Sequence, residues 1–117
     1  MNLELLRNYC LGLKGVTEHF PFDNRTLVFK VMDKMFCLTD VEEFESINVK
    51  CDPELAIALR ERYPAVQPGY HMHKAHWNTV LIDGSITTTQ IFEWVKLSYD
   101  LIVAGLPKKL RSELDGL

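Results

Sequence analysis

Three histidines lie close together in the stretch GYHMHKAHWNTV, which runs from Gly69 to Val80. His71 and His73 are two residues apart, so on a strand their side chains would point the same way and could supply two nitrogen ligands to zinc. His76 could approach as a third ligand, although no carboxylate or cysteine neighbours these histidines in the sequence. Because spacing alone is weak evidence for a metal site, we expect surface histidines in a hairpin loop and keep metal binding by His71, His73 and His76 as an alternative.

Lysines accompany these histidines and suggest contact with nucleic acid. The residues that could contribute are Lys30 and Lys50 on predicted strands, Lys34 and Lys74 at two predicted hairpin tips, and His76 and Trp77 beside the second tip. Such tips can neutralise phosphates and place an aromatic ring beside bases. The alternative is an ordinary solvated surface, since lysines on sheet edges also prevent aggregation between strands. We expect Trp77 to serve as a core residue that anchors its hairpin.

Catalytic motifs are not recognisable in the sequence. The chain has no G-x-S-x-G elbow and no phosphate-binding glycine loop. Cys37 and Cys51 fall within predicted strands, where a cysteine usually acts as a small buried hydrophobe. Asp23 and Asp83 occur in turn contexts, for which turn hydrogen bonding is the plain interpretation. We therefore predict a protein that is not an enzyme and that needs no cofactor.

Length and composition favour one small soluble domain. The chain has 117 residues, 47% of them hydrophobic, which suits a single domain spanning residues 1–117. Its formal charge of −3 argues against whole-chain attraction to DNA or to anionic lipid. With three separated cysteines, no signal peptide and no membrane-spanning run, we expect a cytoplasmic monomer with reduced thiols and no membrane contact.

Hydrophobic periodicity predicts strands between helices. A first helix capped by Asn2 is followed by a strand in VTEHFPF, a hairpin in TLVFKVMDKMFCLTD with its turn at Asp33–Lys34, and a strand in SINVKC. Asp52 and Pro53 then begin a helix that ends before Pro64, and AVQPGYH and HWNTVLID form a second strand pair.

The clearest predicted helix begins at Thr87, because Gln90 follows it at the spacing of a capping box. The apolar stripe of this helix comprises Ile91, Trp94, Val95, Ser98, Leu101 and Ile102, and Phe92 and Tyr99 widen it. A short helix in PKKLRSEL follows. This order of elements predicts an α+β fold, an antiparallel sheet with helices packed on one face.

Several segments together resemble a known family. They are FPFD (20–23), VFKVMDKMFCL (28–38), INVKCDPELAIALRERYP (47–64), PGYHMHKAHWNTVLIDG (68–84) and SYDLIVAGLPKK (98–109). In this succession the chain resembles the MmcQ/YjbR family of small bacterial proteins. The resemblance implies a CyaY-like fold with paired hairpins in a double-wing arrangement, and a DNA-binding role. It implies no catalytic residues.

These observations leave two functions open. The first is binding of DNA, or of a similarly anionic partner, through the lysine-bearing hairpin tips. The second is an adaptor that binds a protein or a small ligand on the open face of the sheet, without a nucleic-acid role. A positive surface that joins both tips would favour the first, and an apolar or mixed concave face would favour the second.

Overall fold

The computed structural model describes residues 1–69 and 72–117. Along the chain the elements are α1 (Leu3–Leu11), β1 (Val16–His19), β2 (Thr26–Val31), β3 (Lys34–Asp40), β4 (Ser46–Lys50), α2 (Pro53–Arg62), β5 (Val66–Pro68), β6 (Trp77–Leu81), α3 (Thr88–Ala104) and α4 (Lys108–Asp115). Within the described residues, the strands form one antiparallel sheet in the order β1-β2-β3-β4-β6-β5. This confirms the α+β prediction.

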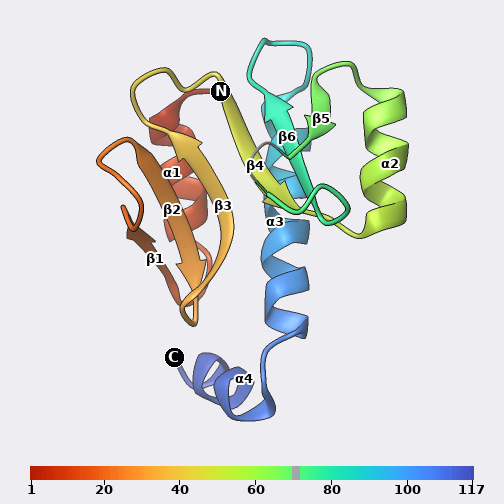
Figure 1. The fold of residues 1–117 in the computed structure, drawn as a ribbon. Helices are drawn as coiled ribbons and strands as arrows, with labels where there is room; N and C mark the ends of the chain where they lie inside the picture. The colour runs from red at the N-terminus through yellow and green to blue at the C-terminus, as the bar shows by residue number, and fades with distance from the viewer. Residues whose placement is uncertain (70–71) are drawn as a thin grey trace.

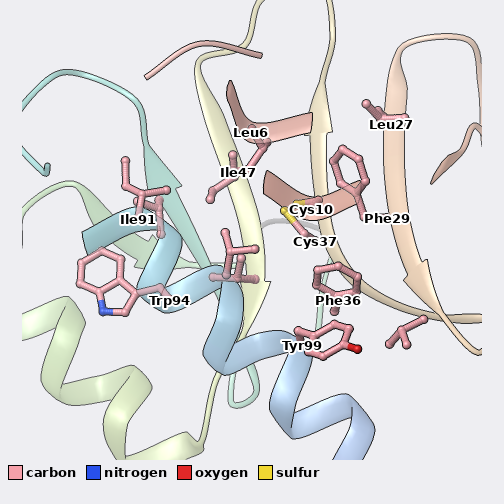
Figure 2. Close-up of a cluster of buried hydrophobic side chains, with 14 of the residues drawn as sticks. Leu6, Cys10, Leu27, Phe29, Phe36, Cys37, Ile47, Ile91, Trp94 and Tyr99 are labelled. Atoms are coloured by element: carbon pink, nitrogen blue, oxygen red, sulfur yellow. The ribbon is translucent and has the colours of Figure 1, made fainter. Parts of the chain in front are cut away.

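The helices pack on one face of this sheet and leave the other face open. In Figure 1, α1 and α3 pass behind the strands, so the open face is toward the viewer. Between the sheet and these helices lies the main core, part of which is shown in Figure 2, where Leu6 and Cys10 of α1 meet Phe29 and Cys37 of β2 and β3. None of the described helices is both long and apolar enough to cross a bilayer.

Three polar side chains cap the helices as the sequence predicts. Asn2 accepts a hydrogen bond from the backbone N–H of Leu5, and Asp52 accepts one from that of Leu55. Thr87 accepts from the N–H of Gln90. Each cap satisfies a backbone donor that has no partner inside its helix.

The predicted stripe of α3 is wrong at one position. Ile91, Trp94, Val95 and Ser98 are buried as expected, but Leu101 is 38% exposed. Tyr99, which was expected to widen the stripe, is buried, and its hydroxyl donates a hydrogen bond to the carbonyl of Lys14 at 2.6 Å.

The first hairpin turns one residue earlier than predicted. Met32 and Asp33 occupy the turn with φ angles of 48° and 66°, and Lys34 already pairs with Val31 as the first residue of β3. Two successive positive φ values match the right-handed twist of the flanking strands, which explains the turn despite Met32 being an unusual residue there. The preceding strand is also shorter than predicted, because β1 ends at His19, before Pro21.

A β-bulge interrupts the β2–β3 pair. Phe29 pairs with Cys37 and Lys30 pairs with Met35, so Phe36 has no partner in the register. The buried hydroxyl of Ser98 on α3 donates to the Phe36 carbonyl at 2.5 Å and accepts from the N–H of Lys50 at 2.8 Å. The Ser98 side chain therefore hydrogen-bonds the bulged backbone of β3 and fixes α3 against β3 and β4.

Candidate functional site

The four predicted lysines lie toward one end of the sheet. Lys34 begins β3, Lys50 ends β4, and Lys74 lies in the turn that leads into β6. Because these strands are antiparallel neighbours, these positions share an end of the sheet. Lys34 and Lys74 are exposed. Lys30 lies near the end of β2, before the turn to β3, and is half-buried. Its ammonium nitrogen lies 3.5 Å from a carboxylate oxygen of Asp33.

The predicted histidine cluster is only partly within the described residues. His73 and His76 are exposed, and their ring centroids lie 4.8 Å apart, whereas His71 lies outside the described residues. In residues 1–69 and 72–117 no group of three metal-ligating side chains comes together. Metal binding by His71, His73 and His76 therefore stays the alternative to surface histidines in a loop.

Trp77 is buried, but on the open face of the sheet and apart from the main core. It is 8% exposed and forms a small cluster with Val28 and Leu38, against which Met35 and Met72 pack. The prediction that Trp77 anchors its hairpin is consistent with this position, because the ring ties β6 to β2 and β3. Its burial leaves little of the ring available to stack on a base.

Sequence reasoning missed a network around Arg60 that holds the turn carrying Lys74. The Arg60 guanidinium of α2 donates to the buried Asn78 side chain at 2.7 Å and to the Trp77 carbonyl at 3.2 Å. It also donates to the carbonyl of Lys74. The available signal was Asn78 itself, since an asparagine inside a buried strand requires polar partners.

A groove lies on the open face of the sheet and has a volume of about 760 Å³. Its buried base includes Leu38 and Trp77, and Met35 and Met72 also line it. At its edge Phe22, from the β1–β2 loop, is 65% exposed. We call this cavity the open-face groove.

Polar groups line the remainder of the open-face groove. Thr79 of β6 donates to the Asn48 side chain of β4 at 2.6 Å, and Ser46 lies further along β4. Two carboxylates, Asp23 and Asp40, line the end of the groove where β2 begins and β3 ends. The lining is therefore mixed, with an apolar base and an acidic end.

Local hydrogen bonds keep both carboxylates ionised. The backbone N–H groups of Thr26 and Arg25 donate to Asp23 at 2.7 and 2.9 Å and lower the pKa of its carboxyl group. The Arg25 guanidinium lies 2.7 Å from the Asp40 carboxylate and lowers the pKa of that group, with the backbone N–H of Glu42 adding to the effect. Hydrogen bonds to the charged form favour ionisation.

Comparison with known proteins assigns the chain to a family. The YjbR family model matches residues 11–101, a segment that contains every residue of the groove. This protein belongs to the YjbR family. The YjbR protein of Escherichia coli is 36% identical over 115 residues, which cover 97% of this chain and 98% of that protein. That relative is itself uncharacterized, so membership in the YjbR family brings no activity with it.

Solved structures of two other bacterial proteins share this fold. The crystal structure of the Deinococcus radiodurans protein DR2400 has a TM-score of 0.91 and 38% identity, covering 97% of this chain and 88% of that one. A Pseudomonas syringae protein has a TM-score of 0.74 and 27% identity, covering 86% of this chain and 98% of that one. The shared fold therefore includes the sheet and the helices that pack on it.

Proposed function

We propose that this protein is a non-enzymatic binding module that holds a small ligand or a partner segment in the open-face groove. The observation that carries this proposal is the groove itself. Its volume of about 760 Å³ lies within the range typical of small-molecule sites. It combines an apolar base at Leu38 and Trp77 with polar groups at Asn48 and Thr79, the usual composition of a ligand pocket.

A titration followed by NMR tests whether the groove binds ligands. Amide shifts are recorded while the protein is titrated with phenylalkyl amines, acids and alcohols, and with nucleosides. We expect at least one class to shift amides of groove residues such as Leu38 and Asn48. Shifts confined to the helical side for every class would contradict the proposal.

A groove-blocking variant sharpens this test. Ser46 is half-buried in the groove, so Ser46→Arg places a long side chain in the binding space. The matched control is Ser112→Arg, an identical change at an exposed position of α4. Ser46→Arg should abolish the ligand-induced shifts while Ser112→Arg retains them, and equal binding by both variants would count against the groove.

DNA binding remains a second candidate, favoured by the placement of Lys34, Lys50 and Lys74 at one end of the sheet. Such a cluster could neutralise phosphates even on an acidic chain. Against it stand the carboxylate beside Lys30 and the burial of Trp77. DNA binding at the end of the sheet that carries Lys34 and Lys74 therefore comes second to ligand binding in the groove. The groove reaches this end as well, since Met35 and His73 line it.

A salt-titrated DNA-binding assay tests this second candidate. Lys34→Glu/Lys74→Glu should weaken binding to double-stranded DNA and reduce the salt slope by about 2, because two phosphate contacts are lost. Lys108→Glu/Lys109→Glu, at the start of α4, makes the same charge change elsewhere on the surface. A flat salt response of the unmodified protein, or equal loss in both double variants, would rule out the proposed contact.

A further inference from the structure

The acidic end of the open-face groove limits which ligands can bind there. Asp23 and Asp40 both line the groove, and no lysine or arginine is among the described residues that line it. The two carboxylates flank Thr26, which pairs with Asp40 across the strands and donates its N–H to Asp23. A ligand that lies along the groove therefore meets negative charge at this end.

Only one of these carboxylates is neutralised by a basic partner. The Arg25 guanidinium contacts Asp40 at 2.7 Å and Glu42 at 3.2 Å. Asp23 receives hydrogen bonds from two backbone N–H groups and from the Thr26 hydroxyl. The Arg25 charge also lowers the pKa of Asp23, but in the described part of the chain no ion pair within 4 Å joins Asp23 to a basic side chain. The Asp23 carboxylate thus keeps its negative charge available to a ligand.

Aromatic and thioether side chains line the groove beside these carboxylates. Phe22 is adjacent to Asp23 in the chain and keeps 65% of its surface in water. Trp77 lies at the base, and Met35 and Met72 provide adaptable apolar contacts. Aromatic faces and carboxylates both attract cations, whereas an apolar ligand body would cover the exposed Phe22 ring.

On the basis of the proposed function, we propose that the ligand of the open-face groove is a small organic cation with an apolar body. Its ammonium or guanidinium group lies at the Asp23 end, and its apolar body covers the Phe22 ring and the base at Trp77. An anionic head group would be repelled from the Asp23 end of the groove.

Three ligands that share one apolar body test this proposal. Phenylpropylammonium, phenylpropanol and phenylpropionate differ chiefly in the charge of the head group, and their affinities can be compared by NMR titration of the full chain. We expect the cation to bind about fivefold more tightly than the alcohol, because an exposed ion pair and a cation–π contact each contribute modestly. The anion should bind most weakly.

A matched pair of variants locates the source of the preference. Asp23→Asn keeps an oxygen that accepts the Thr26 and Arg25 N–H groups but removes the charge. Asp83→Asn is the control, because Asp83 also accepts hydrogen bonds in a turn, from Ser85, but does not line the groove. Asp23→Asn should abolish the preference for the cation over the alcohol, while Asp83→Asn should preserve it.

The outcomes separate this inference from the proposed function. If the alcohol or the anion shifts groove amides at least as strongly as the cation, the groove binds ligands but the inference about charge is wrong. The same conclusion follows if Asp23→Asn retains the full preference. If none of the three ligands shifts groove amides at millimolar concentration, this inference fails, and the groove proposal then depends on the nucleosides in its own titration.

Discussion

Ser98 and Phe36 are 62 residues apart in the sequence, and the Ser98 hydroxyl on α3 donates a hydrogen bond to the Phe36 carbonyl at 2.5 Å. Because of the bulge, Phe36 has no register partner in β2, and the same hydroxyl accepts a hydrogen bond from the Lys50 N–H. The contact is fully buried, because Ser98 has no exposed surface.

Replacing this serine should destabilise the fold. Ser98→Ala leaves a buried carbonyl and a buried N–H without their partner, so we expect the free energy of unfolding to fall by about 1–3 kcal/mol. Ser112→Ala, on the exposed surface of α4, should change it by less than about 0.5 kcal/mol. Urea denaturation of both variants measures the difference, and equal stability would show that Ser98 is not a structural link.

Arg60 should control the order of the turn that carries Lys74. In Arg60→Met the apolar stem is retained, but the hydrogen bonds to Asn78 and to the backbone of the turn are lost. We expect faster amide hydrogen exchange at His76 and Trp77, and a loss of about 1–3 kcal/mol of stability. Arg62→Met is the control, because Arg62 is exposed and contacts the ring of Tyr63. Unchanged exchange in the turn would contradict this role.

Gly69 should not tolerate a side chain. A Cβ atom there would lie 2.8 Å from the Cβ of Trp77 and 3.0 Å from its carbonyl oxygen, so β6 would have to move. We expect Gly69→Ala to cost about 1–3 kcal/mol, as overpacking typically does. At Gly105 the nearest atoms would be at 3.6 Å, so Gly105→Ala should be tolerated. Thermal unfolding compares the two, and a similar Tm for both would refute the close approach.

Acidic pH should lower the folding stability of the protein, partly through protonation of Asp40. Its folded-state pKa is lowered by Arg25, so the unfolded chain binds a proton at this group more readily than the folded chain does. The stability that Asp40 contributes is therefore present above its unfolded pKa of about 3.9 and is lost as the pH falls below that value.

Asp40→Asn removes this titration. We expect the variant to be less stable than the unmodified protein at neutral pH and to lose less stability between neutral and acidic pH, as measured by urea denaturation at a series of pH values. Asp33→Asn is a suitable control, since Asp33 is 92% exposed. An identical pH dependence for the Asp40→Asn variant and the unmodified protein would argue against the contribution of the Arg25 pair.

Local signals in the sequence predict most of the fold. Asp52 with Pro53, and Thr87 with Gln90, specify helix starts through bonds within a single turn, so they can be identified without tertiary context. The hairpin turn was misplaced because Met32 adopts a positive φ that its type does not suggest. Leu101 was assigned to the core because an apolar periodicity cannot show where the sheet beneath a helix ends.

The residues that line the candidate site could not be predicted from the sequence to the same extent. The lysines were expected on two strands and at two hairpin tips. Lys30 and Lys50 do lie on β2 and β4, but Lys34 begins β3 instead of forming the turn. Nothing in the sequence indicated that Asp23 and Trp77 line one groove. That groove is formed by a loop, four strands and a turn, so its composition depends on the register of the whole sheet. Arg60 was missed for a similar reason, since its partners belong to β6 and the turn before it.

The placement of all the helices on one side of the sheet has an evolutionary consequence. Residues that hold the molecule together, such as Phe29 on β2 and Val95 on α3, lie in the core between the sheet and the helices, while Ser46 and Asn48 line the groove on the open side. Most substitutions on the open side leave the helix-packed interior intact. A lineage of such proteins can therefore acquire new specificities through small, individually tolerable steps, while its scaffold is inherited unaltered.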